Sequence, residues 1–256
     1  MTRIVDLSIP LDNEIPADPP FQPVSIEYTA HPEGAAAMVA AFPGLTTDEL
    51  PDGQGWAVEQ VNISTHNGTH MDAPWHYHPT QDGGAPAVKI DEIPLDWCMR
   101  PGVKLDFREV PDGHVVTAAE IDAELARIDY ELQPFDIVLC NTRAGERFGE
   151  ADYVDAGCGF GREATLHLAE QGIKIVGTDG WSWDAPFSAT AKRYAETGDA
   201  SLIWEGHKAG RERGYCQLEK LHALEQLPAT GFTVICFPVK IAAASAGWTR
   251  CVAVLP

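Results

Sequence analysis

One short segment of this chain holds an unusual density of side chains that can bind metals or transfer protons. Residues 66–76 contain His66, His70, Asp72 and His76, at positions i, i+4, i+6 and i+10. With His78 two residues later, four of the nine histidines of the chain lie in this region. Neutral imidazole and carboxylate are the usual nitrogen and oxygen ligands of zinc, manganese and similar divalent ions. The segment therefore predicts a metal site with spare acid/base groups beside it.

The spacing of these residues also predicts how the backbone must run. Their positions share one parity, so an extended strand would place all of them on one face. A straight strand is excluded, because six residues span about 20 Å whereas ligands of one ion lie only about 2.0–2.2 Å from it. The Asn67-Gly68 dipeptide favours a turn, since both residues tolerate positive φ. We therefore expect a buried strand over Val58–Ser64 that leads into a ligand-bearing turn.

Gly68 and Pro74 argue against a helical arrangement of these residues. A helix would bring His66 and His70 together, but Gly68 and Pro74 disfavour a long helix here. Pro74 also restricts Ala73 to extended geometry, so the chain changes direction before His76. We expect His78, which precedes Pro79, to lie beside the ligands or on the loop surface.

The pattern His66-x-Gly68-Thr69-His70-x-Asp72-x-Pro74-x-His76 resembles the signature of the cyclase family of metal-dependent hydrolases. That family includes bacterial kynurenine formamidase, isatin hydrolase and a trans-dienelactone hydrolase. Similarity to the family extends along the chain to residues 5–11, residues 15–20, residues 176–179 with Ser182 and Asp184, and the pair His207 and Glu219. Ile9 departs from the pattern, because many relatives have histidine there.

The resemblance implies a set of metal ligands. His66, His70 and Asp72 would bind a first ion, and Asp72 would bridge to a second ion held by His207 and Glu219. The resemblance implies zinc or manganese, with one or two ions per chain. Taken without the resemblance, His207 suits a solvated loop and Glu219 suits the surface of a helix.

The resemblance implies that His76 is the proton donor and acceptor, a role that suits an imidazole titrating near neutrality. A bound divalent ion would lower the pKa of water toward about 7, which makes hydroxide available for attack on a carbonyl. We therefore expect a metal-dependent hydrolase that cleaves a small amide, imide or lactone, similar to kynurenine formamidase or isatin hydrolase.

Several alternatives remain at this stage. A trans-dienelactone-type lactone hydrolase is one, and a non-catalytic metal or small-molecule binding protein is another. A structural metal site would fill every coordination position with protein ligands. Serine-based hydrolysis is disfavoured, because the G-x-S-x-G nucleophile elbow is absent.

Composition narrows the class of protein. The 256 residues suit one domain spanning 1–256, and the formal charge of −20 disfavours nucleic-acid binding. The six cysteines form no C-x-x-C pair, and the start of the chain lacks the apolar region of a signal peptide. No apolar run approaches a membrane span. We expect a cytoplasmic protein that binds a small-molecule substrate, contacts neither nucleic acid nor membrane, and forms a homodimer or higher homo-oligomer.

Strands and helices are expected to alternate late in the chain, which predicts an α/β fold; the resemblance implies a swivelling β/β/α domain with mixed sheets and outer helices. Further strands are expected at 4–7, 103–107, 137–141, 173–178, 234–238 and 251–255. Helices are expected at 117–128, where Thr117 and Glu120 form a capping box, and at 161–171, which Gly172 ends. A short helix is expected at 35–41, and a short helical or turn segment at 218–224.

Two further segments are candidates for contacts with substrate or partner. Residues 29–56 lack a clear period, and long loops of this kind often cover a substrate or contact a partner. A loop over residues 180–200 carries Trp181, Trp183, Phe187 and Tyr194. Such aromatic residues usually pack in a core, but near a site they would form an apolar pocket for a flat substrate.

Overall fold

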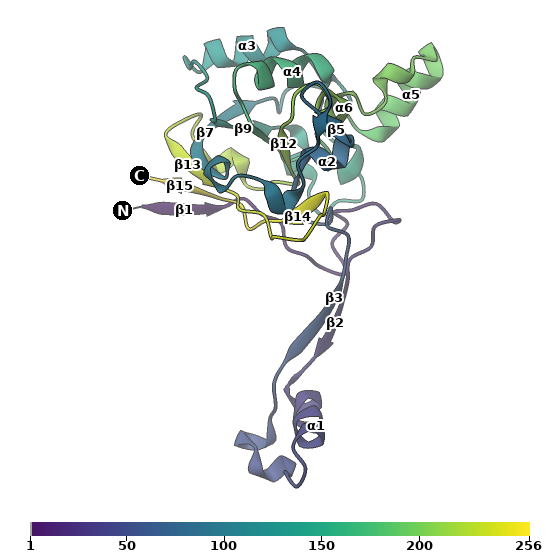
Figure 1. Cartoon of the computed structure of the whole chain (residues 1–256), viewed down its shortest axis with the longest axis vertical. Coiled ribbons are helices and arrows are strands. Elements are labelled where there is room, and N and C mark those ends of the chain that lie inside the picture. The colour runs from purple at the N-terminus through teal and green to yellow at the C-terminus, as the bar shows by residue number, and fades with distance from the viewer. Residues whose placement is uncertain (1) are drawn as a thin grey trace.

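A large mixed β-sheet lies at the centre of the structure, a computed structural model that describes residues 2–256 (Figure 1). Its nine strands within these residues follow the order β1 (Arg3–Asp6), β15 (Val252–Leu255), β13 (Phe232–Ile235), β7 (Met99–Asp106), β9 (Ile137–Asn141), β11 (Ile175–Thr178), β12 (Cys216–Glu219), β4 (His70–Asp72) and β14 (Ala246–Trp248). Strands β7, β9, β11 and β12 run parallel, and the pairs on either side of them are antiparallel.

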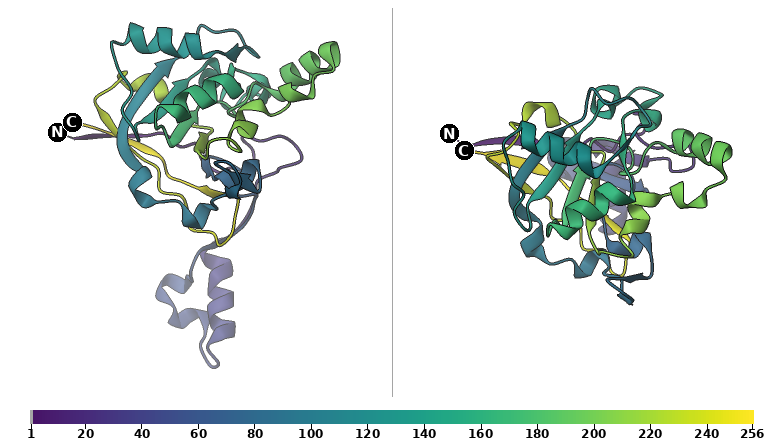
Figure 2. Two further views of the ribbon diagram at one scale, coloured as in Figure 1. Left: turned by 45° about the horizontal axis from the view of Figure 1, so that its top comes forward. Right: turned by 90° about the horizontal axis from the view of Figure 1, so that it is seen from above.

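The central strands are buried on both faces. All five residues of β9 and all four of β11 are buried, which explains their continuous Val/Ile/Leu sequences. Ile137 and Leu139 of β9 belong to one hydrophobic cluster, and Val138 and Cys140 belong to a second. The second cluster includes residues of α3 (Ala118–Arg127) and α4 (Arg162–Glu170), which cover that face of the sheet (Figure 2).

The ends of these two helices follow local sequence signals. Thr117 accepts a hydrogen bond from the backbone N–H of Glu120, and the Glu120 carboxylate accepts one from the backbone N–H of Thr117. Gly172, which follows the C-terminal capping residue Gln171 of α4, has a φ of +88°, a conformation that favours glycine. The predicted helices at 117–128 and 161–171 are therefore confirmed.

Most predicted strands are also found, with ends shifted by one to a few residues. The prediction of a helical or turn segment at 218–224 is wrong at its start, because Cys216–Glu219 forms the buried strand β12. This strand lies inside the sheet, between β11 and β4. The polar residues Gln217 and Glu219 are buried there, which a pattern of apolar and polar residues does not predict.

Short helices replace part of the predicted loop at 180–200. Residues Phe187–Thr197 form α5, which follows Pro186 and ends at Gly198 with a φ of +68°. Two other short helices carry histidines: α2 (Pro74–Tyr77) and α6 (Glu205–Ala209). The described connections also contain the 3-10 helices η1 (Thr47–Glu49), η2 (Pro51–Gly53), η3 (Ile90–Glu92), η4 (Leu95–Trp97), η5 (Arg143–Arg147), η6 (Tyr153–Asp155), η7 (Ala200–Leu202) and η8 (Leu224–Gln226).

Three two-stranded sheets accompany the large sheet in the described residues. Strands β8 (Val115–Val116) and β10 (Gly159–Phe160) pair in parallel, and β5 (Thr80–Gln81) pairs with β6 (Ala85–Pro86) in antiparallel. The third sheet consists of β2 (Ser25–Thr29) and β3 (Val58–Asn62), which are antiparallel.

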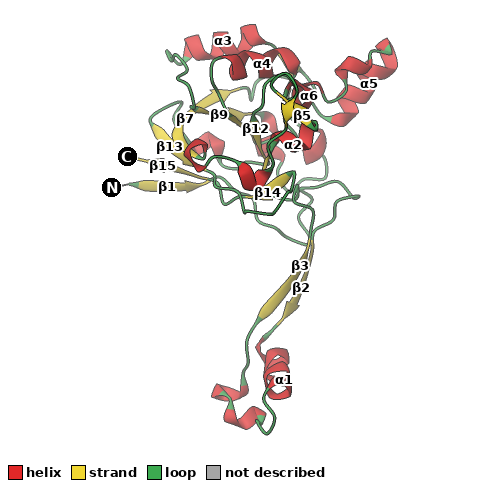
Figure 3. Ribbon diagram, in the orientation of Figure 1, coloured by secondary structure: helices red, strands yellow, loops and turns green. Residues whose placement is uncertain are grey.

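The β2–β3 hairpin belongs to an arm that projects from the rest of the chain (Figures 1 and 3). We define the arm as residues 25–62; between its two strands lie α1 (His31–Ala41), η1 and η2. The predicted helix at 35–41 is therefore part of the longer α1. The prediction of a buried strand over Val58–Ser64 is wrong, because every residue of β3 is exposed. Its only strand partner among the described residues is β2, and no helix or second sheet covers its faces.

The two chain ends lie side by side, because β1 pairs with β15 (Figure 2). Within residues 2–256, no helix has the length and apolar character needed to cross a membrane.

Candidate metal centre

A tight turn and a short strand present the first candidate ligands. The Asn67 carboxamide oxygen accepts a hydrogen bond from the Ser64 N–H at 2.6 Å, and Gly68 has a φ of +60°. Strand β4 begins two residues later, so His70 and Asp72 share one of its faces while Met71 points into the core. The His66 and His70 rings lie 5.1 Å apart, so the chain folds back as the spacing requires.

Asp72 lies at the middle of the cluster and is completely buried. Its Oδ1 is 2.9 Å from His66 Nδ1 and 3.1 Å from His70 Nε2. Its Oδ2 is 3.8 Å from the Nε2 atoms of His76 and His207. One carboxylate therefore faces four imidazoles, two on each oxygen.

His207 and Glu219 reach the same cluster from a distant part of the chain. His207 lies on α6, and Glu219 ends β12 directly opposite His70 in the β4–β12 pairing. Glu219 Oε2 is 3.6 Å from His70 Nε2, and Oε1 is 3.6 Å from His207 Nε2. Both side chains are buried, so neither is the surface residue that its local sequence suggests.

The geometry of these donors fits a divalent cation. Ligands about 2.0–2.1 Å from a tetrahedral ion lie roughly 3.3 Å from one another, close to the separations found here. His70 Nε2 and both oxygens of Asp72 are buried without a hydrogen-bond partner, which is costly unless another group satisfies them. Two triads have donor atoms within 4.8 Å of one another: His66 with Asp72 and His76, and His70 with Asp72 and Glu219.

Neighbouring groups orient the imidazoles toward the centre. His70 Nδ1 is 2.9 Å from the carbonyl oxygen of Gly68, and His66 Nε2 is 3.0 Å from the Ser245 hydroxyl. His207 Nδ1 contacts the Asp184 carboxylate at 2.5 Å, which leaves Nε2 facing Asp72 and Glu219. Hydrogen bonds of this kind fix the tautomer and the ring direction of a metal-binding histidine.

Burial and close charges shift the pKa values of the cluster. Burial by itself would raise the pKa of Asp72, but His76, His66 and His70 hold it well below its usual range. Burial, followed by the charge of Asp72, raises the pKa of Glu219. Burial lowers the pKa of His76 to about 3, against the opposing effect of Asp72. The role of His76 in proton transfer stays a prediction, because a cation bound among these residues would itself change the charges that act on the imidazole.

A small cavity of about 190 Å³ borders the cluster. His66, His76, His207 and Glu219 line it on the side of the candidate ligands. Its remaining wall includes the aromatic residues Phe21, Trp181, Phe187 and Trp204. A small molecule in this cavity would therefore contact both the candidate metal centre and several aromatic rings.

Comparisons with known proteins place the chain in a family. The Cyclase family model, described as "Putative cyclase", matches residues 5–185. The chain belongs to the Cyclase family. The match includes residues 66–76, whereas His207 and Glu219 lie beyond it, so their place in the centre rests on the geometry described above.

This Cyclase-family chain is similar to a kynurenine formamidase and to two isatin hydrolases of solved structure. It is 28% identical over 207 residues to a kynurenine formamidase of Erythrobacter litoralis, covering 80% of this chain and 81% of the relative. It is 27% identical to the solved isatin hydrolase A of Labrenzia aggregata, with a TM-score of 0.73 and coverage of 99% of this chain and 94% of that one. A second isatin hydrolase structure, bound to the product analogue thioisatinate, has a TM-score of 0.76 at 20% identity and covers 100% and 93% of the two chains. The α/β class predicted from the sequence is thereby confirmed.

Three residues of this Cyclase-family chain contribute to the centre without having been predicted from the sequence. Lys220 is buried, and its ammonium group contacts Asp18 Oδ1 at 2.7 Å and donates to the His66 carbonyl oxygen at 2.6 Å. Ser245 contacts His66, and Trp204 stacks on His207 with ring centroids 4.4 Å apart. Lys220 and Ser245 carry no sequence signal. Trp204 lies three residues before the candidate ligand His207 in the sequence.

Other predicted residues lie outside the cluster. Trp183 does not line the cavity but is buried and stacks on Phe160. Asp179 accepts hydrogen bonds from the N–H and hydroxyl of Thr142, and burial raises its pKa to about 7. His78 bonds within its own loop, to Thr80, as expected.

Proposed function

We propose that this protein is a metal-dependent hydrolase that cleaves the carbon–nitrogen bond of a small amide carrying a flat ring. The observation that most strongly supports this proposal is the group of buried nitrogen and oxygen donors around Asp72, which borders a cavity with aromatic walls. The relatives named above support the reaction class, because a formamidase and an isatin hydrolase both act on amide bonds. The proposal extends that class to this chain.

The proposed cofactor is zinc or manganese, held by His66, His70 and Asp72, with His207 and Glu219 completing a second position. The nitrogen-rich donor set suits these ions. When bound, such an ion supplies Lewis acidity and lowers the pKa of a coordinated water toward about 7.

His76 is the proposed carrier of the proton. Hydrolysis adds the water oxygen to the carbonyl carbon, breaks the carbon–nitrogen bond and moves one water proton to the departing nitrogen. His76 lines the cavity, and its Nε2 is 3.8 Å from Asp72 Oδ2. From this position at the edge of the cavity, the imidazole is the proposed group that takes a proton from water and returns it to the departing nitrogen. The same position also suits a direct metal ligand, and mutation separates the two roles.

The cavity favours a small substrate. Its volume of about 190 Å³ is below the roughly 300–1,000 Å³ usual for sites of drug-sized ligands. Trp181, Phe187 and Trp204 form an apolar wall, which favours a planar ring over an extended aliphatic chain. An aryl formamide or a cyclic aryl amide meets these requirements.

The test is metal analysis joined to a substrate screen. Purified protein is assayed on N-formylkynurenine, isatin and an aryl lactone, as isolated, after chelation, and after adding back zinc or manganese. We expect bound divalent metal, faster hydrolysis of at least one amide than of the lactone, and loss of activity on chelation that metal restores.

A His70→Ala variant serves as the matched control, since His70 is completely buried within the cluster. It should lack both metal and activity. Metal-loaded wild-type protein that hydrolyses none of the three compounds would contradict the proposed function. Faster hydrolysis of the lactone than of either amide would indicate that the substrate is an ester and not an amide.

A further inference from the structure

Lys220 combines an unusual backbone conformation with a buried charge beside the candidate metal centre. It directly follows Glu219 at the end of β12, and its φ of +54° lies in the left-handed region, which few residues other than glycine adopt. Its side chain is only 1% exposed, although lysine is seldom buried unless its charge is paired. A strained backbone and a buried cation persist at one position only where the surrounding structure holds them.

The backbone of Lys220 is held from two sides. Its N–H donates to the Gly180 carbonyl oxygen at 2.9 Å, and its carbonyl oxygen accepts a hydrogen bond from the Thr69 hydroxyl at 2.6 Å. Thr69 Oγ1 in turn accepts a hydrogen bond from the Ile9 N–H at 2.9 Å. These contacts fix the direction in which the side chain leaves the backbone, so the fold determines where the ammonium group lies.

The ammonium group of Lys220 joins two segments that are distant in the sequence. It contacts Asp18 Oδ1 at 2.7 Å and donates to the His66 carbonyl oxygen at 2.6 Å. The Asp18 side chain is only 5% exposed, so solvent and salt screen this ion pair less than a pair on the surface. Removal of one partner would leave a buried charge without compensation, so the two residues depend on each other.

The segment that contains Asp18 forms part of the wall of the cavity. We define the wall segment as residues 17–22; its last two residues, Phe21 and Gln22, line the cavity beside the candidate ligands. Two prolines directly follow Asp18 and restrict the backbone, and the Gln22 N–H donates to the Pro19 carbonyl oxygen at 2.8 Å. A displacement of Asp18 would therefore be passed on to Phe21 and Gln22.

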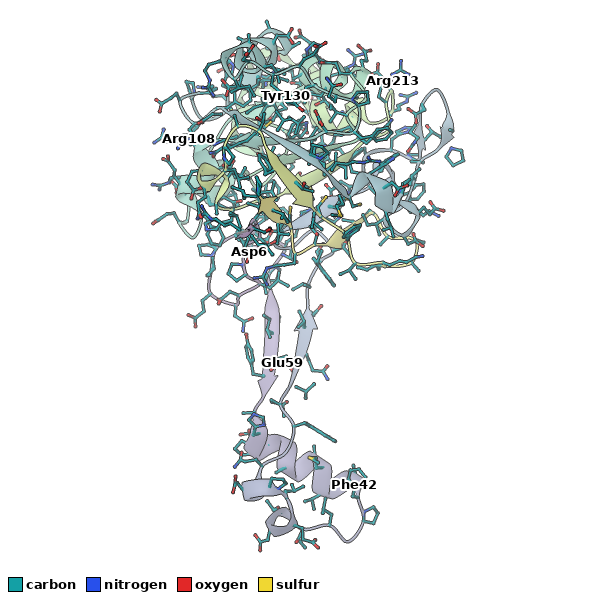
Figure 4. All side chains as sticks on the ribbon, turned by 90° about the vertical axis from the view of Figure 1, so that its left-hand side faces the viewer. Asp6, Phe42, Glu59, Arg108, Tyr130 and Arg213 are labelled. Atoms are coloured by element: carbon teal, nitrogen blue, oxygen red, sulfur yellow. The ribbon has the colours of Figure 1, made fainter. Side chains whose placement is uncertain are left out.

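The wall segment lies where the arm leaves the body of the molecule. It contains neither strand nor helix, and β2 begins three residues after Gln22. Figure 4 shows the arm extending away from the body, with Phe42 at its far end. Because strand pairing does not fix the wall segment, its position depends on contacts such as the one between Asp18 and Lys220.

The wall segment is also bonded to the turn that carries the first candidate ligand. The Gly68 N–H donates to Asp18 Oδ2 at 3.3 Å, and Asn67 Nδ2 donates to the Gln22 carbonyl oxygen at 2.8 Å. Lys220 adds the third connection, because its ammonium group contacts both Asp18 and the His66 carbonyl oxygen. The cavity wall and the His66 turn therefore meet at one buried cation.

We propose that Lys220 is a positioning residue whose ammonium group holds the wall segment against the His66 turn, so that the first metal ligand and the cavity wall are fixed together. The inference rests on the metal centre of the proposed function and deepens it. Binding of metal at His66 and binding of a flat ring against Phe21 each favour the same arrangement, so each should strengthen the other by an equal factor. This coupling should depend on Lys220.

Zinc affinity, measured by competition with a chelator, tests the effect on the ligand turn. Lys220→Met should bind zinc roughly 10–100-fold more weakly than wild type, as is typical when a group that orients a metal ligand is changed. Lys104→Met is the matched control, because Lys104 is also buried and its ammonium group also donates to a backbone carbonyl oxygen, that of Leu227 at 2.7 Å. Lys104 lies on β7, outside the lining of the cavity, so this variant should bind zinc like wild type.

Binding of indole tests the coupling between metal and cavity wall. Indole is a flat ring whose nitrogen lone pair belongs to the aromatic system, so it is a poor metal ligand and any coupling must pass through the protein. Equilibrium dialysis should show at least about fivefold tighter binding of indole to zinc-loaded than to zinc-free wild type, the lower end of usual coupling between sites. The ratio should fall to about 1 in Lys220→Met and stay at the wild-type value in Lys104→Met.

Two further variants separate positioning from charge balance and from backbone strain. Lys220→Met combined with Asp18→Asn removes the buried charge that the single variant leaves without its partner, and it should still bind zinc weakly. Lys220→Gly removes the ammonium group and relieves the left-handed backbone, and it should also bind zinc weakly. Circular dichroism should match wild type, and Lys220→Gly serves as the test if Lys220→Met does not fold.

Three results would overturn the role of Lys220. One is wild-type zinc affinity in the folded Lys220 variants, and another is recovery of that affinity in the double variant, which would reduce the role to charge balance. The third is a wild-type protein without coupling between zinc and indole, or a coupling that persists in Lys220→Met. Wild-type protein that binds no zinc or manganese would instead contradict the proposed function, so the two failures are distinguishable.

Discussion

At the scale of single residues, His76 is the most exposed of the four histidines of the cluster. Its side chain is 25% exposed, compared with 17% for His66, 2% for His207 and 0% for His70. It also lies on α2, beyond the bend at Pro74, rather than on the strand that carries His70 and Asp72. A residue that transfers protons needs this access to substrate, whereas a ligand can be enclosed.

We predict that His76→Ala keeps the metal and lowers the rate of hydrolysis by roughly 10²–10⁴-fold, the usual contribution of a general acid or base. His70→Ala should lose metal and activity together. Metal content is measured before any rates are compared, with His78→Ala as control because, within residues 2–256, the His78 ring bonds to Thr80 of its own loop. A metal-free His76→Ala protein would make His76 a ligand and Glu219 the next candidate for proton transfer. Full activity would exclude a role in proton transfer.

Asp184 positions His207 rather than contacting the centre itself. Its carboxylate contacts His207 Nδ1 and accepts hydrogen bonds from the N–H groups of Gly206 and His207. We predict that Asp184→Asn lowers metal affinity roughly 10–100-fold, as is typical when the partner of a metal-binding histidine is changed. The affinity is measured by competition with a chelator. Asp122→Asn removes a carboxylate from the surface residue His167 and is the matched control; equal affinities in both variants would refute the role of Asp184.

At the scale of elements, side chains alternate along β4, so the candidate ligands lie on one face of the strand and a core residue lies on the other. His70 and Asp72 face the centre, while Met71 between them is completely buried in the main hydrophobic cluster. The neighbouring strand β12 brings Glu219 opposite His70. The ligand set therefore depends on strand pairing that Met71 helps to hold in the core.

We predict that Met71→Ala lowers the free energy of unfolding by about 2–5 kcal/mol, as expected for truncation of a buried side chain. Met71→Leu should cost less than about 1.5 kcal/mol, because it conserves volume. Urea denaturation measures both effects, and metal stoichiometry well below the transition should remain that of wild type. Loss of metal by Met71→Ala without loss of stability would show that the side chain acts on the centre directly.

At the scale of the whole molecule, metal binding should stabilise the fold. The cluster joins β4, α2, α6 and β12, which come from separate parts of the chain. In the absence of a cation, burial and the charge of Asp72 disfavour the ionised form of Glu219 and raise its pKa. Because the complete donor set exists only in the folded state, an ion that binds there favours folding by mass action.

We predict that free metal at about 1,000 times its dissociation constant adds about 4.1 kcal/mol to the free energy of unfolding. For a chain of this size, that gain corresponds to a rise in Tm of roughly 8–16 °C. Thermal denaturation of chelated and metal-loaded protein measures it. Asp72→Ala should not respond to metal, whereas His78→Ala should respond like wild type; an equal response in Asp72→Ala would place the stabilising ion elsewhere.

Local features of the fold were predictable where neighbouring residues determine them. Asn67-Gly68 forms the turn, and Thr117 with Glu120 caps α3, because each depends on contacts within a few residues. The continuous apolar segments β9 and β11 are strands inside the sheet, as their composition predicts. The pattern in residues 66–76 similarly identified the candidate ligands closest in sequence.

The remainder was decided by tertiary structure. His207 and Glu219 have the local sequence of surface residues, and only the resemblance to a family indicated them; their burial beside Asp72 follows from the pairing of β12 with β4. Strand β3 has apolar residues suited to a core, yet it is exposed, because no other element of the described chain covers it. The sequence by itself thus determines which residues can bind, turn or form a strand. Which of them become buried together depends on long-range packing, since burial is a property of the elements that meet and not of either element alone.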